Sequence, residues 1–498
     1  MALQIKLANL CTQADVLGVF VTEGDLDAQL QKLSIQVDNL GQIAADRKFK
    51  GSKSAQLCVP LHNLSYKYLI LVGLGKPKAT EPYVENLRRA IAEMVRAAEG
   101  CSAKTIAINL PSAQLFGVSD LYMLEHAAVA AQLANHKFDT YLTDASKKEV
   151  NLDVTLVVAG NLAQLQAALD KAILMAEAVN QTRRWVDLPA NHLTPAILAD
   201  KMLAVAKKVG LKSTVFGEAE IIQMGMGGLH AVSRGSVEDC RFVLLEYDCG
   251  DKSAPTVALV GKGILYDTGG LSIKPAQSME TMKEDMAGAA AVVSAMQVIA
   301  QLKPKVNVIG CTPLAENMPS GTAGRPGDII TFYNGKTAEV KNTDAEGRLI
   351  LADALSYVVS NYKLDAVVDI ATLTGACEYA LGNFFSALIS EHDNLAAQVT
   401  KAGEVSGDRV WRLPLTDDYK PCMNSNIADL SNIASGRFKA GTINGACFLQ
   451  HFVKDVPWVH LDIANTAYNL GMLPYYRADS ATGVGVRLFV EFVMAFQK

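Results

Sequence analysis

The chain has 498 residues, of which 50% are hydrophobic and 19% are charged, with 46 Lys and Arg against 51 Asp and Glu. A chain of this length exceeds the size of one hydrophobic core, so two domains are expected. The formal net charge of −5 provides no general attraction to nucleic acid or to an anionic membrane.

Residues 1–160 alternate short apolar runs with segments of helical spacing. The helical segments are Glu81–Glu99 and Leu121–His136. Such alternation predicts a mainly parallel or mixed sheet flanked by helices, which is an α/β domain. The strands are expected at Val16–Val21, Tyr68–Val72, Thr105–Leu110 and Val154–Val158.

A long helical pattern without Pro or Gly runs from Leu162 to Val186 and stops at Asp187-Leu188-Pro189-Ala190-Asn191. Proline and asparagine are helix-terminating signals, so residues 161–190 are predicted to form a helical connector. Thr194-Pro195 then predicts a new helix with proline in its first turn.

Residues 191–498 repeat the alternation with stronger strands and predict a second α/β domain. Ala287–Gln301 and Arg348–Tyr362 are its expected helices. Two of its strands run into glycine-rich turns, over 256–270 and 366–376. Because ligands of open α/β sheets lie beyond the carboxyl ends of strands, these turns are expected to meet at one crevice. The expected strands are Arg241–Tyr247, Thr256–Val260, Val306–Pro313, Ala366–Ala371 and Trp458–Ile463.

Three features favour a soluble cytoplasmic protein. The uncharged stretch Met286–Leu302 is rich in alanine and contains Ser294 and Gln297, which indicates a buried core helix rather than a membrane span. The N-terminus lacks the basic and apolar regions of a secretory signal. The nine cysteines are scattered and include no C-x-x-C pair, which favours mostly buried free thiols in a reducing compartment.

The chemically distinctive part of the sequence lies between Val257 and Asp353. Charges in such apolar or glycine-rich surroundings must be paired or bound to metal. Hard oxygen ligands around two nearby dications are typical of two-metal hydrolases, so we interpret this stretch as a dinuclear metal site. The candidate site residues within it are four carboxylates, two lysines and one arginine: Asp267, Asp285, Asp344, Glu346, Lys262, Lys274 and Arg348.

Each of these residues also has a simpler interpretation. Thr343-x-x-Glu346 matches a capping box, and Asp285 is placed to cap the helix expected from 287. Asp267 before Thr-Gly-Gly fits a turn aspartate. Spacing alone makes Lys262 a salt-bridge partner of Asp267, since an ammonium group binds metal only after losing its proton.

Other hydrolase signatures are absent from the sequence. It contains no H-E-x-x-H zinc motif and no G-x-S-x-G nucleophile elbow. His460, inside an apolar strand, is expected to be a core histidine with a satisfied hydrogen bond.

The segments 260–275, 282–290, 313–328 and 342–355 resemble the M17 leucyl aminopeptidase family, the two-metal cytosolic exopeptidases. The most specific match is the octapeptide Asn-Thr-Asp-Ala-Glu-Gly-Arg-Leu at 342–349. The resemblance spans about residues 180–498 and is looser in the N-terminal domain, and it implies two α/β domains with the active site in the second.

The resemblance also implies residue roles. Asp267 and Glu346 would bridge the two metals, Lys274 would act on the substrate carbonyl, and Arg348 would hold a bicarbonate ion that shuttles protons. Asn465 and Tyr266 depart from the commoner family residues, glycine and phenylalanine. The implied metal ligands are Lys262, Asp267, Asp285, Asp344 and Glu346, and the implied pocket for the substrate side chain is Met282, Thr372, Gly375, Ala464 and Ala467.

The function implied by this resemblance is release of N-terminal leucine and other apolar residues from peptides by a metal-activated water. Mn²⁺ or Zn²⁺, and also Co²⁺ or Mg²⁺, suit the oxygen-rich ligands. A homohexamer is implied, with the N-terminal domain serving assembly or regulation. Two alternatives stay open: DNA binding through a local basic patch, which the net charge does not suggest, and hydrolysis of Cys-Gly dipeptides or other amides.

Overall fold

The computed structural model describes residues 3–24, 26–31, 33, 35, 37–61, 65–77, 83–143 and 152–498. The chain divides into two compact units, Met1–Asn180 with Leu470–Asp479 and Gln181–Asn469 with Ser480–Lys498. Helix α5 (Leu162–Asp187) contains the boundary between them. The return of residues 470–479 to the first unit is a feature that no sequence pattern indicated.

The first unit is built on a six-stranded sheet of order β1-β6-β5-β2-β4-β3, in which only β3 runs antiparallel to its neighbour. The four predicted strands are confirmed: three agree within one residue at their ends, and β4 continues three residues beyond the predicted end at Val72. Helix α3 begins at Val84, and residues 81–82 of the predicted helix lie outside the described residues. The bounds are β1 Gln4–Ala8, β2 Val16–Thr22, β3 Gln56–Pro60, β4 Tyr68–Gly75, β5 Thr105–Asn109, β6 Asp153–Val157, α1 Leu26–Leu30, α2 Leu40–Asp46, α3 Val84–Gly100 and α4 Asp120–Asn135.

The second unit is built on a nine-stranded mixed sheet of order β16-β15-β18-β14-β9-β11-β8-β7, with β10 added beside β11. The central pairs β18–β14, β14–β9 and β9–β11 are parallel, and the pairs β15–β18, β11–β8 and β8–β7 are antiparallel. The predicted α/β class is therefore confirmed for both units. The strand bounds are β7 Lys212–Phe216, β8 Arg241–Tyr247, β9 Thr256–Gly261, β10 Gly263–Asp267, β11 Asn307–Asn317, β14 Ala366–Ala371, β15 Ser386–Ile389, β16 Val410–Leu413 and β18 Trp458–Asp462.

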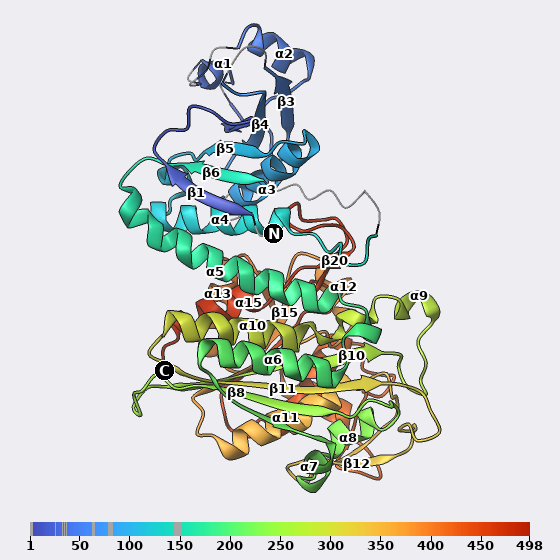
Figure 1. Ribbon diagram of the computed structural model, residues 1–498. Helices are drawn as coiled ribbons and strands as arrows, with labels where there is room; N and C mark the ends of the chain where they lie inside the picture. Colours follow the sequence, from blue (N-terminus) through green and yellow to red (C-terminus); the bar gives the residue numbers. More distant parts are fainter. Residues whose placement is uncertain are drawn as a thin grey trace. The chain divides into compact units, whose positions relative to one another are not determined.

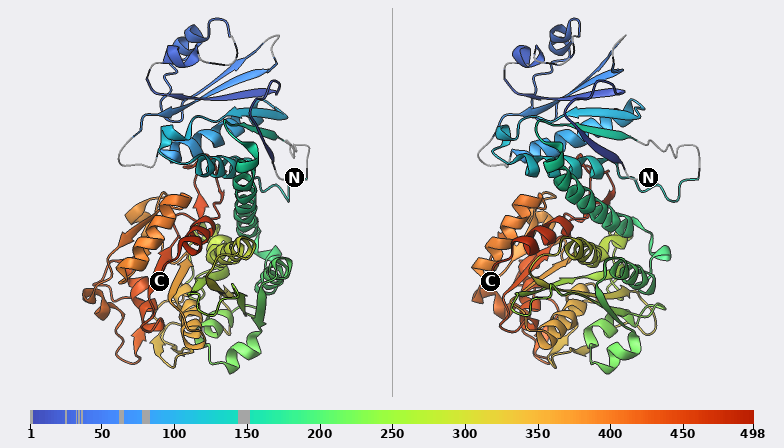
Figure 2. Two further views of the ribbon diagram at one scale, coloured as in Figure 1. Left: turned by 90° about the vertical axis from the view of Figure 1, so that its left-hand side faces the viewer. Right: turned by 60° about the vertical axis from the view of Figure 1, so that its left-hand side comes forward.

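Helices cover both faces of this sheet (Figure 1 and Figure 2). The helices α6 (Pro195–Val209), α10 (Ala287–Leu302), α13 (Asp393–Ser406) and α15 (Val486–Ala495) lie on one face. The helices α8 (Gly227–Ser233), α11 (Gly347–Asn361) and α14 (Gly441–Leu449) lie on the other. Apolar side chains from both layers and from the sheet form the core, which is the expected arrangement when each layer has an apolar face to bury. Helix α6 begins at Pro195, as the Thr-Pro pair predicted, and the Thr194 side chain accepts a hydrogen bond from the N–H of Ile197.

The alanine-rich helix α10 is a core helix, as its composition predicted. The segment Ala276–Leu302 is long and apolar enough to cross a membrane, but 89% of its most apolar window is buried inside the protein. Helix α10 contacts β9 and β11 below it and α15 beside it. Its small side chains allow the close approach that places the segment before it, residues 282–286, against β10.

Asp353 links α11 to two neighbouring segments. Its buried carboxyl leads us to expect a free energy of unfolding that depends on pH. Its fully buried carboxylate accepts hydrogen bonds from the backbone N–H groups of Tyr333 and Leu229, both at 2.8 Å. Burial raises the pKa of Asp353 to about 7, so the folded state keeps a proton that the unfolded chain loses near pH 4. The contribution of Asp353 to stability therefore falls as the pH rises through this window.

Relative to Asp353→Asn, we expect wild-type protein to lose on the order of 2 kcal/mol of unfolding free energy between about pH 5 and pH 7.5. Chemical denaturation of both proteins across this range measures the difference. A difference that does not change with pH would contradict an ionising buried carboxyl at this position.

Candidate metal centre

Lys262 is a buried cation at the centre of the cluster, in the turn between β9 and β10. Its side chain is only 2% exposed. The Nζ atom lies 2.7 Å from Asp285 Oδ1 and 2.8 Å from Glu346 Oε1, and it donates to the carbonyl oxygen of Thr372 at 2.8 Å. Three segments that are far apart in the sequence thus meet at one ammonium group. The predicted convergence of the turns after β9 and β14 is confirmed by these contacts.

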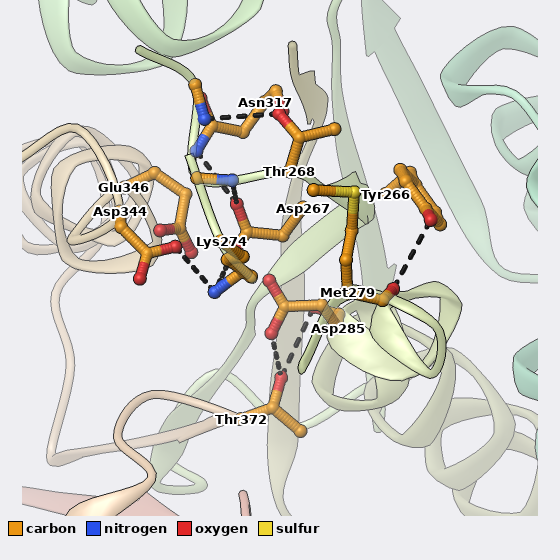
Figure 3. Close-up of polar contacts among 12 residues, drawn as sticks. Tyr266, Asp267, Thr268, Lys274, Met279, Asp285, Asn317, Asp344, Glu346 and Thr372 are labelled. Atoms are coloured by element: carbon orange, nitrogen blue, oxygen red, sulfur yellow. Dashed lines mark hydrogen bonds and ion pairs between the residues drawn. The ribbon is translucent and has the colours of Figure 1, made fainter. Parts of the chain in front are cut away.

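Lys274 is the second cation of the cluster, and Figure 3 shows it between two carboxylates. Its Nζ lies 2.8 Å from Asp267 Oδ2 and 2.5 Å from Asp344 Oδ1. Asp267 is the last residue of β10, while Asp344 lies in the turn before α11. The carboxylate of Glu346 lies beside that of Asp344 in the same view.

The loop after β10 is locked to the turn before α11 by Thr343. Its hydroxyl donates to the carbonyl oxygen of Gly269 at 2.6 Å and accepts from the N–H of Ser272 at 2.8 Å. Gly269 and Gly270 have φ angles of 85° and 63°, which side-chain-bearing residues rarely adopt. The two glycines allow the chain to turn sharply enough for Lys274 to return to Asp267.

The helix-capping interpretations of Glu346 and Asp285 are wrong. Glu346 does occupy the position before α11, but no side chain caps that helix, because the Glu346 carboxylate pairs with Lys262 instead. Asp285 does not cap α10, because its Oδ1 pairs with Lys262 and accepts the hydroxyl of Thr372 at 2.7 Å. Asp267 is indeed a turn aspartate, since its Oδ1 accepts the N–H of Gly269 at 2.9 Å.

The salt-bridge partner expected for Lys262 from spacing is also wrong. Lys262 pairs with Asp285 and Glu346, whereas Asp267 pairs with Lys274. The separation along the sequence favours the nearer carboxylate, but the loop after β10 brings Lys274 to Asp267.

Asn317 belongs to the cluster, although no role was predicted for it. From the end of β11, its side-chain amide donates to Asp267 Oδ1 at 2.8 Å and to the carbonyl oxygen of Thr343 at 3.0 Å. Figure 3 shows the amide turned toward Asp267. The signal available in the sequence was that Asn317 ends an apolar strand, just as Asp267 ends another. Asn317 fixes the orientation of the Asp267 carboxylate.

The protonation preferences of the cluster follow from burial and from the two lysines. Burial raises the pKa of Asp267 to about 6, with a further contribution from Glu346, and burial also raises the pKa of Asp285. Burial would raise the pKa of Glu346 as well, but Lys262 and Lys274 outweigh it and hold that pKa at about 2. The carboxylates likewise raise the pKa of Lys262 against the opposing effect of burial. In the absence of a dication, Lys262 is therefore an ion-paired ammonium.

The cluster fits a divalent metal in its donor atoms and in its charge. One oxygen each from Asp267, Asp344 and Glu346 lie within 4.8 Å of one another. Asp285 Oδ2 is buried and has no hydrogen-bond partner among the described residues, so it has a free lone pair for a cation. The four carboxylates outnumber the two lysines by two charges, and a buried excess of this kind requires a positive partner.

Arg348 lies in the first turn of α11, where it is 7% exposed. One guanidinium nitrogen donates to the carbonyl oxygen of Asn432 at 2.8 Å. Its Nε is buried and has no hydrogen-bond partner among the described residues. Arg348 thus has donor capacity left for a small anion.

Position 347, beside Arg348, requires glycine because the Lys262 side chain lies too close for any other residue, and not because of its backbone angles. A Cβ atom at this position would lie 2.4 Å from Cε of Lys262 and 2.7 Å from its Nζ. Any side chain would therefore displace the buried ammonium from its carboxylates.

The residues proposed for the substrate pocket come from three segments. Thr372 follows β14, and its hydroxyl donates to Asp285, which belongs to the 3-10 helix that starts at Met282. Gly375 precedes helix α12 (Ala376–Leu381), while Ala464 and Ala467 follow β18. The last two segments are joined by a carboxylate that the sequence did not single out: Asp462 Oδ1 accepts from the N–H groups of Leu373 and Ala464.

His460 is buried in β18, as expected. Its Nδ1 lies 2.6 Å from Asp369 Oδ1, and Trp458 donates to the other oxygen of the same carboxylate at 2.6 Å. Nε2 of His460 is buried without a hydrogen-bond partner among the described residues, so the histidine is only half satisfied.

Comparison with known proteins agrees with this geometry. Residues 180–490 match the catalytic domain of the cytosol aminopeptidase family, and residues 16–145 match its N-terminal domain. A probable cytosol aminopeptidase of Alkaliphilus oremlandii is 37% identical over 99% of this chain and 98% of its own length. One of Rickettsia peacockii is 40% identical over 86% of each chain.

Solved structures cover nearly the whole chain. The bottromycin maturation enzyme BotP in complex with Mn superposes with a TM-score of 0.84 at 34% identity, covering 97% of this chain and 99% of its own. A mutant of tomato leucine aminopeptidase superposes with a TM-score of 0.86 at 30% identity, covering 99% and 96%. Family matches to both units, together with relatives that align over almost their full length, show that the chain belongs to the M17 cytosol aminopeptidase family of metal-dependent exopeptidases.

Proposed function

We propose that this protein releases N-terminal leucine and other apolar residues from peptides, using a water activated by two divalent metals. The observation that supports this proposal best is the buried cluster itself, in which four carboxylates exceed two lysines and three carboxylate oxygens lie within 4.8 Å. Membership of the family supports the aminopeptidase reaction, and the Mn complex of BotP supports a transition metal in a related protein.

Five residues would hold the metals: Lys262, Asp267, Asp285, Asp344 and Glu346. When bound, the metals supply a water of lowered pKa and polarise the scissile carbonyl. The family resemblance implies that Asp267 and Glu346 would each contribute to holding both metals. Lys262 would have to lose its proton on metal binding, since an ammonium group has no lone pair.

Lys274 would stabilise the negative charge that develops on the substrate oxygen. Asp267 and Glu346 outweigh burial and raise the pKa of Lys274, so it remains a hydrogen-bond donor at neutral pH. A fixed donor in a partly buried site stabilises such charge more than water does. Lys274 is held from two sides, by Asp267 and Asp344, and therefore needs little reorganisation.

Arg348 would hold a bicarbonate ion close to the cluster. Its unpaired Nε and its buried position support a bound anion. Each of the four carboxylates of the cluster is engaged by a lysine, so we propose that a separate anion accepts and passes on a proton. Arg348 then acts by placing that anion.

The proposed pocket for the first side chain is lined by Met282, Thr372, Gly375, Ala464 and Ala467. It has few bulky residues, which favours leucine and side chains of similar size. We also propose that the protein works in the cytoplasm, as the names of its relatives suggest, and as the homohexamer that the family resemblance implies.

The proposal is tested with leucine p-nitroanilide and metal-depleted protein. We expect hydrolysis to be lost on metal removal and restored by Mn²⁺ or Zn²⁺, because the carboxylates alone cannot generate the nucleophile. N-acetyl-leucine p-nitroanilide should remain uncleaved, since an exopeptidase that releases N-terminal residues requires their free amine. Metal-loaded protein that fails on this substrate and on a panel of unblocked dipeptides, Cys-Gly included, would rule out the aminopeptidase function.

A further inference from the structure

Helix α12 borders the proposed pocket through Gly375, and two of its six residues, Cys377 and Leu381, pack in or against the apolar core. It starts directly after Gly375, and Cys377 is its only buried residue. Tyr379, the largest side chain of the helix, is 95% exposed. A helix of six residues has little stability of its own, so contacts with neighbouring segments must fix its position.

One end of α12 is fixed by Asp462. The Thr374 hydroxyl donates to Asp462 Oδ2 at 2.6 Å, and the N–H of Leu373 donates to Oδ1 at 3.1 Å. Ala376 also packs against the start of α14, where a Cβ atom on Gly441 would lie 2.7 Å from the Cβ of Ala376. These contacts hold the residues before α12 and its first turn, but they do not reach the C-terminal end of the helix.

The far end of α12 is held by Asn465, which is 3% exposed and lies between the pocket residues Ala464 and Ala467. Its amide Nδ2 donates to the carbonyl oxygens of Gly382, the residue after the helix, and of Phe385, the latter at 2.8 Å. Its Oδ1 accepts the thiol of Cys377 at 3.1 Å. The Asn465 side chain thus bonds to the inner face of the helix and to the loop that follows it.

Two further contacts join the segment around Asn465 to the loop after α12. The carbonyl oxygen of Asn465 accepts the side-chain amide of Asn383 at 3.0 Å, and the hydroxyls of Thr466 and Ser386 lie 2.7 Å apart. Gly382 has φ 60° and ψ −154°, a conformation close to exclusive to glycine, so the loop is shaped to present its carbonyl oxygen to Asn465. Every hydrogen-bonding group of the buried Asn465 amide is used.

We propose that Asn465 is a positioning residue that fixes α12 and thereby determines which N-terminal side chains the pocket accepts. This inference rests on the proposed function, because it assumes that Gly375, Ala464 and Ala467 line the pocket. None of the described hydrogen bonds of Asn465 reaches a proposed metal ligand. It therefore acts on substrate selection and not on the reacting atoms.

The first test measures α12 directly and needs no activity. In Asn465→Ala, the Cys377 thiol and two carbonyl oxygens lose their partner, so the helix should open more often. We expect alkylation of Cys377 by iodoacetamide, followed by peptide mass spectrometry, to be at least about tenfold faster than in wild type. Cys311, which is fully buried in β11, serves as an internal reference whose labelling should not change.

The second test measures selectivity with leucine and alanine p-nitroanilides. We expect Asn465→Ala to lower the leucine-to-alanine ratio of kcat/KM at least about fivefold, mainly through a higher KM for leucine, because the wall that contacts the longer side chain is no longer fixed. Asn465→Asp should have a larger effect, since a carboxylate cannot donate to Gly382 or Phe385.

The matched control is Asn444→Ala, which removes another buried amide of the same unit, one that donates to the carbonyl oxygen of Phe438. It should leave the substrate ratio and the labelling of Cys377 unchanged. If Asn465→Ala does not fold, Asn383→Ala weakens the same connection from its more accessible side and should shift both measurements in the same direction.

The inference is overturned if either the labelling of Cys377 or the substrate ratio stays within about twofold of wild type in the folded Asn465 variants. This outcome differs from failure of the proposed function. In that case the metal-loaded wild type itself cleaves neither substrate, while the labelling experiment still reports on α12.

Discussion

Replacing Glu346 with glutamine should lower kcat/KM for leucine p-nitroanilide by roughly a thousandfold or more, because the proposed function makes Glu346 a ligand of both metals. Glutamine keeps the size of the side chain and removes its charge. The Glu346 carboxylate is 3% exposed, ion-pairs with Lys262 and lies within 4.8 Å of carboxylate oxygens of Asp267 and Asp344. Its low pKa of about 2 means that the charged form is the functional one at neutral pH.

Steady-state kinetics and the metal content of the purified variant measure this effect together. Glu339→Gln is the matched control, because Glu339 is a carboxylate of the same unit that pairs only with Ser425 and Lys341 in its described contacts. We expect the control to retain activity within about twofold. If Glu346→Gln kept full activity and full metal content, the metal centre would have to lie elsewhere.

Replacing Lys262 with methionine should abolish activity and also destabilise the metal-free protein, by about 3–5 kcal/mol. Lys262 neutralises Asp285 and Glu346 in a site that excludes water, and methionine leaves these two charges buried without a counter-ion. Divalent metal should recover a large part of this loss, because a dication supplies the missing positive charge. Denaturation with chelator and with Mn²⁺ gives the two values.

Lys341→Met is the control for this experiment. Lys341 forms an ion pair with Glu339 at 3.4 Å, but its side chain is 43% exposed, so its loss should cost less than about 1 kcal/mol in either condition. Equal destabilisation of Lys262→Met with and without metal would show that the lysine neutralises no charge that a dication can replace.

The two α/β units, the strands at their centre and the identity of the cluster could all be predicted from the sequence. Apolar runs of strand length and helical spacing are local properties, so β8 and β14 were placed at their full extent. The octapeptide at 342–349 was equally informative, because it matches the signature of the family, whereas its local pattern alone favoured a helix cap.

Strand β10 was not predicted, because Gly261 and Gly263 indicated a turn. In the structure these glycines serve close packing: a Cβ atom on Gly261 would lie 2.4 Å from the carbonyl oxygen of Gly288. Nothing in the local sequence distinguishes a glycine required by a neighbouring helix from a glycine required by a turn. The same ambiguity made Glu346 and Asp285 resemble helix caps, since capping is judged from local spacing alone.

The sequence by itself determined which residues are the candidates for the chemistry, because their types, their apolar surroundings and the family motif are written in the chain. Only the tertiary structure decided the partners: Lys262 with Asp285 and Glu346, Lys274 with Asp267 and Asp344, and Asn465 with the end of α12. The hydrogen bond from Lys262 to Thr372 joins residues 110 positions apart. Such pairings depend on where separate strands end in the folded sheet, and sequence spacing contains no measure of that distance.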